Sequence, residues 1–167
     1  MSTVVVMKKK RIPRPLFNPL IMAMAGASIM TTEERDRIRM IELSAMEEFR
    51  RGSATIDDWQ LIANMCNICH ILAKKGYGPE ALPSIEKMQE HMSRLNKQYI
   101  EHGKMTITMA ALDAMRDVYE YADLQRQSVS RGAYEKANRE MLNRVEHHYA
   151  NQRKKREVFE KESLNDN

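Results

Sequence analysis

Residues that interrupt helices are scarce in the second half of this 167-residue chain. All 5 prolines fall within the first 83 positions, and after Pro83 the glycines are Gly103 and Gly132. Aromatic residues make up only 6% of the chain, whereas methionine occurs 14 times. Because methionine fills irregular gaps between packed helices, and strands favour aromatic and β-branched residues, this composition favours helices over sheets.

Other absences narrow the possible functions. No apolar run approaches the ~20 residues that cross a bilayer, so we expect a cytoplasmic protein with no membrane contact. The sequence has neither a Gly-x-Ser-x-Gly nucleophile elbow nor a glycine-rich phosphate loop. Paired acids such as Asp57–Asp58 stand at expected helix starts, where they favour capping over acid–base catalysis. We therefore predict a non-enzymatic protein with no catalytic residues, no cofactor and no metal.

Helix caps and apolar spacing predict about five helices. Thr31 and Glu34 form a capping-box pattern, and Thr55 starts the next helix, with Asp57 and Asp58 at the positive end of the helix dipole. The expected helices cover residues 31–52, 55–76, about 82–102, a stretch that begins near 106 or 108, and about 131–160. Short connections imply antiparallel neighbours, so the predicted fold is an all-α, up-and-down bundle. Residues 20–162 form this bundle domain, residues 163–167 a frayed tail, and residues 20–30 are either a short helix or a strap.

Apolar residues at three- and four-residue spacing predict the buried side of each helix. The expected inner faces of the first, second and last helices consist of Ile38, Ile41, Ala45 and Phe49; of Trp59, Ile62, Cys66, Cys69 and Ala73; and of Tyr134, Ala137, Met141, Val145 and Tyr149.

Cys66, Cys69 and His70 match the Cys-x-x-Cys-His attachment pattern of c-type haem. A basic stretch followed by residues 20–27, which end in Ala-Gly-Ala, resembles an export signal, but prolines interrupt it. Both cysteines share an apolar stripe within a capped helix, where free cysteine serves as a small buried hydrophobe. We interpret them as core residues and keep a haem or metal protein as a remote alternative.

The net charge of +4 is unevenly distributed. Residues 1–14 contribute +5 and residues 151–167 contribute +1, which leaves −2 for residues 15–150. Prolines at 13, 15 and 19 favour an extended chain, so residues 1–19 are predicted to form a basic arm in front of a mildly acidic body. Such an arm could neutralise phosphates or dock in an acidic cleft. Its candidate partner-binding residues are Lys8, Lys9, Lys10, Arg11 and Arg14, with Leu16 and Phe17 as apolar anchors.

A second basic cluster lies near the end of the last expected helix. A run of four consecutive basic residues, Arg153, Lys154, Lys155 and Arg156, faces all sides of a helix. The four side chains therefore cannot all contact one groove of a nucleic acid. They could contact a phosphate backbone, or simply favour the negative end of the helix dipole. We count them among the candidate partner-binding residues.

Several stretches taken together resemble a group of uncharacterised helical proteins from proteobacterial genomes and their prophages. The similar stretches are residues 15–19 (PLFNP), 54–59 (ATIDDW), 76–83 (GYGPEALP) and 123–128 (DLQRQS). The resemblance covers roughly residues 8–145 and rests on loop and capping residues, so it assigns no functional residue. It implies a mobile-element setting, in which small non-enzymatic helical proteins bind host machinery.

From these observations we expect a phage- or prophage-encoded binding protein that engages and modulates a host protein or nucleoprotein complex, such as a defence or transcription complex. The alternative is a nucleic-acid-binding regulator that uses the basic arm and residues 153–156. A homodimer is compatible with the methionine-rich helices, although no strict heptad seam is visible.

Overall fold

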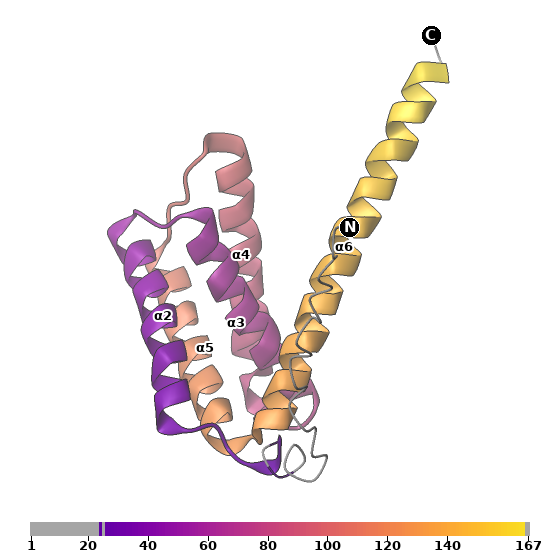
Figure 1. The fold of residues 1–167 in the computed structure, drawn as a ribbon. Helices are drawn as coiled ribbons and strands as arrows, with labels where there is room; N and C mark the ends of the chain where they lie inside the picture. Colours follow the sequence, from indigo (N-terminus) through magenta and orange to yellow (C-terminus); the bar gives the residue numbers. More distant parts are fainter. Residues whose placement is uncertain (1–23, 25, 166–167) are drawn as a thin grey trace, which may run out of the picture.

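The computed structural model describes residue 24 and residues 26–165, and nearly all of that part is helical. Figure 1 shows the helices as one bundle with a long last helix that leaves it at an angle. The prediction of an all-α bundle is therefore confirmed. The α-helices are α2 (Thr32–Arg51), α3 (Ile56–Lys74), α4 (Leu82–His102), α5 (Met109–Ser128) and α6 (Arg131–Asn165), with a 3-10 turn η1 (Pro79–Ala81) before α4.

Local side-chain chemistry sets the helix starts where the sequence predicted them. The Thr31 hydroxyl accepts a hydrogen bond from the amide of Glu34 at 3.3 Å, and the Glu34 carboxylate accepts one from the Thr31 amide at 2.8 Å. Thr55 and Asp58 form the same reciprocal pair at the start of α3. Each pair satisfies amides that the first turn of a helix leaves without partners. At the other end of α2, Gly52 adopts a left-handed conformation with φ 76°, which glycine reaches without steric cost.

Helix α3 is the central element of the fold. It packs against α2, α4, α5 and α6, and α4 and α2 both pack against α5. Its inner side matches the prediction, because Ile62, Cys66, Cys69 and Ala73 are buried and Trp59 is partly buried. The four helices α2–α5 therefore enclose the main core, which includes the methionines 46, 65, 88, 92, 105 and 115.

The predicted inner face of α2 is wrong at one position. Ile41 is 55% exposed, whereas the neighbouring Glu42 is only 5% exposed. The helix is rotated so that Glu42, Ala45, Met46 and Phe49 face inward. The physical reason is a buried arginine, Arg126 on α5, whose guanidinium binds the Glu42 carboxylate.

Helix α6 joins the bundle only by its first half. Its residues Ala137 and Met141 pack with Ile68, Ile71 and Leu72 of α3 in a second, smaller core cluster. Residues 146–156 are exposed, and the helix continues to Asn165, beyond the expected end near Glu160. Among the described helices, none is both long and apolar enough to cross a membrane.

A short N-terminal segment crosses the start of α6. Residues 24, 26 and 27 are helical, and Ile29 forms an isolated antiparallel bridge with Ser130. The Arg131 amide donates to the Ser28 carbonyl oxygen at 2.7 Å. In the described part of residues 20–30, a helical turn is followed by an extended bridge, whereas residues 20–23 and 25 lie outside the described residues.

Candidate functional site

A cleft opens where α6 diverges from α3 and α4. It has a volume of about 710 Å³, and all three helices contribute to its walls. Figure 1 shows how the second half of α6 diverges from the bundle. The lining combines polar side chains, among them the charged Arg144, with apolar side chains, which continue to the base where α6 meets α3.

Side-chain carboxamides dominate the bundle wall of the cleft. Asn64 and Asn67 project from α3, and Gln89 and Asn96 project from α4. The Gln89 amide nitrogen donates to the Asn67 side-chain oxygen at 3.2 Å, which links the two helices. Within the described part of the chain, the side chains of Asn64 and Asn96 make no hydrogen bond. A carboxamide both donates and accepts, so this wall offers hydrogen bonds of either sense.

Apolar side chains frame these amides. The indole nitrogen of Trp59 donates to the Met92 carbonyl oxygen at 2.9 Å, which fixes the ring between α3 and α4. Ile71 and Met141 are buried at the base. Two large apolar residues that line the cleft are exposed to solvent, Ile100 at 75% and Tyr149 at 54%. The cleft thus exposes apolar surface that a partner could cover.

Two histidines line the same cleft. Burial, with the nearby charges of Lys74 and Arg144, lowers the pKa of His70, so its imidazole is neutral at neutral pH. On α6, the Gln152 amide nitrogen lies 3.0 Å from a ring nitrogen of His148. Together with the carboxamides, these rings add hydrogen-bonding groups to the surface of the cleft.

The cysteines of the haem-like motif lie in the core, as predicted. Cys66 and Cys69 are each 1% exposed and belong to the main hydrophobic cluster. Burial raises the pKa of the Cys66 thiol and raises that of Cys69 to about 12, so both stay protonated. In the described residues, no group of three or more His, Cys, Asp or Glu side chains is placed to hold a metal ion.

The second basic cluster lies on the free half of α6. Arg153, Lys154, Lys155 and Arg156 are all exposed. Helix α6 holds 9 basic and 6 acidic residues, whereas residues 32–128 hold 13 basic and 16 acidic residues. The net charges are therefore +3 for α6 and −3 for the bundle. The predicted arm residues Lys8, Lys9, Lys10, Arg11, Arg14, Leu16 and Phe17 lie outside the described residues.

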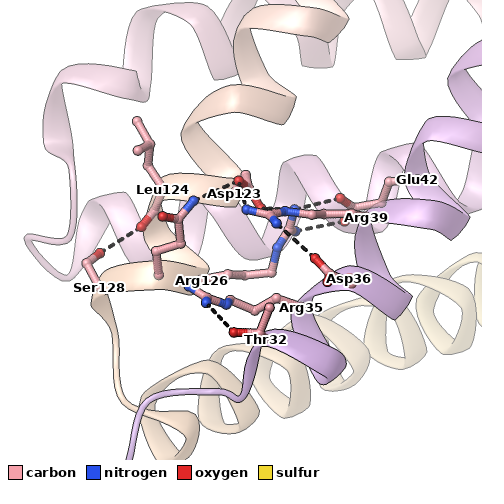
Figure 2. A network of polar contacts seen from close by, with 10 residues as sticks. Thr32, Arg35, Asp36, Arg39, Glu42, Asp123, Leu124, Arg126 and Ser128 are labelled. Atoms are coloured by element: carbon pink, nitrogen blue, oxygen red, sulfur yellow. Dashed lines mark hydrogen bonds and ion pairs between the residues drawn. The ribbon is translucent and has the colours of Figure 1, made fainter.

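A polar network joins α2 to α5 inside the bundle (Figure 2). Arg126 donates to both carboxylate oxygens of Glu42, at 2.9 and 2.8 Å, and Arg39 donates twice to Asp123, both at 2.7 Å. Arg126 also lies 3.5 Å from Asp123, which connects the two pairs. Burial raises the pKa of Glu42 while the Arg126 guanidinium opposes that rise, and the Arg39 hydrogen bonds lower the pKa of Asp123. These contacts organise the bundle and do not open into the cleft.

The sequence analysis did not predict the carboxamides of the cleft or the buried ion pair between Glu42 and Arg126. Asn64 and Asn67 were detectable, because asparagine is a poor residue for a helix interior and two stand one turn apart within an apolar run. Glu42 was detectable as well, since it lies four residues after Ile38 and three before Ala45. Its partner Arg126 is 84 positions away, and no local pattern connects the two.

Comparisons of the chain with protein-family models, with curated proteins and with solved structures found no match.

Proposed function

We propose that this chain is a non-enzymatic binding protein that engages and modulates a host macromolecular complex. The observation that carries the proposal is the second half of α6, which projects from the bundle with Arg153–Arg156 exposed. In keeping with the resemblance drawn from the sequence, the protein would be encoded by a phage or prophage. The complex would then be one of host defence or transcription.

The physical argument begins with the cost of an isolated helix. A helical segment that packs on nothing is marginal in water, since most helical stability in proteins comes from buried faces. Residues 146–156 of α6 are exposed throughout. Contact with a partner would supply the missing packing, and the +3 charge of α6 favours an acidic surface over a basic one.

An affinity capture from a nuclease-treated bacterial lysate tests this function. The full-length chain should retain one stoichiometric protein complex. A variant with Arg153, Lys154, Lys155 and Arg156 all changed to alanine should lose most of it. The matched control changes four exposed cations of the bundle, Arg37, Lys87, Lys104 and Arg116, to alanine and should keep the complex. Equal capture by the wild type and both variants would contradict the role given to α6.

A nucleic-acid-binding regulator is the second candidate, favoured by the same charge on α6 and by the +5 charge of residues 1–14. The dependence of binding on salt concentration distinguishes the two functions. When phosphate neutralisation drives binding, the logarithm of the binding constant falls linearly with the logarithm of the salt concentration, and the slope depends on the number of phosphates contacted. A steep slope with duplex or single-stranded DNA, together with loss of the captured complex after nuclease treatment, would favour the regulator.

A further inference from the structure

We propose that the cleft between α6 and the α3–α4 wall binds a nucleoside monophosphate, with the planar base against the bundle wall and the phosphate against α6. The site is additional to the proposed function and does not depend on it. A ligand of this size would occupy only the cleft side of α6 and would leave Arg153–Arg156 exposed to a partner.

The first argument is the form of the cleft. Its volume of about 710 Å³ lies within the range of about 300–1,000 Å³ that is usual for small-molecule sites. Ile71 and Met141 are buried at its base, and Trp59 is partly buried in its wall. Small-molecule sites combine such an apolar base with a few polar groups on the walls, and the polar groups orient the ligand.

The second argument is the carboxamide wall. Asn64, Asn67, Gln89 and Asn96 are all partly buried, so their amides lose part of their hydration. Asn64 and Asn96 recover none of that loss within the described part of the chain, because their side chains make no hydrogen bond there. The edge of a nucleobase places donors beside acceptors, and a carboxamide can bind such an edge through both of its polar atoms. A bound base would therefore supply the missing hydrogen bonds.

The third argument is the aromatic ring on the opposite wall. Tyr149 of α6 lines the cleft and is 54% exposed. A base can stack on an exposed aromatic side chain, because every base has a flat π face. On the α4 side, Ile100 lines the cleft and is 75% exposed, which adds apolar surface for the same planar ring to cover. Both side chains thus favour a flat ligand.

The fourth argument is charge. Of the described residues, no Asp or Glu lines the cleft, whereas Arg144, His70 and His148 do. The Arg144 guanidinium donates to Glu140 at 2.6 Å, but Glu140 also accepts from Lys75 at 2.6 Å. One carboxylate therefore faces two cations and leaves a net positive charge beside the cleft. Arginine binds phosphate oxygens through charged hydrogen bonds, so the phosphate of the ligand is expected at Arg144.

Calorimetric titration of the full-length chain tests the site. The probes are adenosine, guanosine, cytidine and uridine monophosphates, and at least one of them should bind. Inorganic phosphate is the control for charge attraction and should bind at least about tenfold more weakly. Failure of all four nucleotides to bind at millimolar concentration, or equal affinity for phosphate alone, would overturn the proposal. A short single-stranded oligonucleotide that binds when no mononucleotide does would assign the cleft to nucleic acid instead, and would also overturn it.

A pair of arginine variants tests the position of the phosphate. Arg144→Met should weaken binding of the nucleotide at least about tenfold, because it removes the cation expected to contact the phosphate. Arg139→Met is the charge-matched control, since Arg139 is exposed on α6 and does not line the cleft. It should leave the affinity unchanged. Equal losses in the two variants would show that the net charge of α6 attracts the nucleotide without a defined site, contrary to the proposal.

A pair of asparagine variants tests the position of the base. Asn64→Leu should weaken binding about tenfold, because it removes a donor and an acceptor from the carboxamide wall. It should leave the circular dichroism spectrum and the stability unchanged, since Asn64 makes no hydrogen bond within the described part of the chain. Asn151→Leu is the matched control, because Asn151 is exposed on α6 and does not line the cleft. A folded Asn64→Leu variant that binds as tightly as the wild type would overturn the proposal.

Discussion

Arg126 on α5 and Glu42 on α2 hold each other through two parallel hydrogen bonds, at 2.9 and 2.8 Å, with exposures of only 1% and 5%. Two charges removed from water in this way are costly, and the pair is stable only because its geometry is bidentate. The pair fixes the rotation of α2 about its own axis, since the alternative would bury Ile41 and expose Glu42. It therefore specifies how α2 packs more than it adds to the free energy of folding.

Removal of one partner of the Glu42–Arg126 pair should lower the free energy of unfolding far more than removal of both. Arg126→Met leaves the Glu42 carboxylate buried without a counter-charge and should cost about 3–5 kcal/mol in the free energy of unfolding. The double variant Glu42→Leu with Arg126→Met should recover most of that loss. Urea unfolding followed by circular dichroism at neutral pH measures both. As a control, Arg37→Met breaks the exposed pair with Glu33 and should change stability by no more than about 1 kcal/mol. Equal losses in the single and double variants would contradict the buried-charge explanation.

Acid should weaken the link between α2 and α5 through Asp123. Hydrogen bonds from Arg39 hold the pKa of Asp123 below its ordinary value of 3.8, so the ionised carboxylate stabilises the folded state. That contribution is complete above the unfolded pKa and is lost as the pH falls below about 3.8 through the folded pKa. Asp123→Asn should therefore be less stable than the wild type at neutral pH, and the two should converge in acid. Parallel stability curves down to the lowest pH would show that Asp123 does not titrate in this way.

The crossing of the N-terminal segment over α6 should depend on Gly132. A Cβ at this position would lie 2.9 Å from the Gly26 carbonyl oxygen, a backbone atom that cannot move aside cheaply. Gly132→Ala should displace residues 26–29, expose the Arg131 amide to hydrogen exchange and cost roughly 1–3 kcal/mol. Gly26→Ala is the matched control, because its Cβ would meet only the Gly132 Cα, at 4.0 Å. Similar exchange rates for the Arg131 amide in both variants would exclude this steric account.

The two thiols should be inert while the chain is folded. Burial raises the pKa of Cys69 from 9.0 to about 12, which lowers its thiolate fraction at mildly alkaline pH by about a thousandfold. Iodoacetamide should label neither Cys66 nor Cys69 in native buffer and both in urea, as counted by intact mass. Rapid labelling of the native protein would place at least one thiol at the surface and would favour the haem or metal alternative again.

The elements that sequence patterns located well are those with local causes. Thr31 with Glu34, and Thr55 with Asp58, set helix starts within three residues of chain, and Gly52 ends α2 by its own backbone preference. The inner stripe of α3 followed from spacing alone. These signals lie within one or two turns, which is the range over which sequence periodicity carries information.

The divergence of α6 from the bundle could not be predicted from local sequence patterns. Its apolar stripe continues through Val145 and Tyr149, which predicts continued packing. Whether it packs depends on the facing helix, and α3 offers Ile68, Ile71 and Leu72 at one end but Gln60 and Asn64 at the other. The opposing surface thus turns polar where α6 still carries apolar residues. The amides and exposed rings of the cleft arise from that mismatch between two segments about 80 positions apart.

The position of Trp59 has a practical consequence. It is the chain's single tryptophan, its indole is tied to the Met92 carbonyl oxygen, and one side of it lines the cleft. Tryptophan fluorescence, excited where tyrosine does not absorb, therefore comes from one known place, and its emission wavelength depends on the exposure of the indole to water. Any molecule that enters the cleft and excludes water should shift the emission to the blue, whereas contacts at the basic end of α6 should leave it unchanged. Trp59 is therefore an intrinsic fluorescent probe of the cleft.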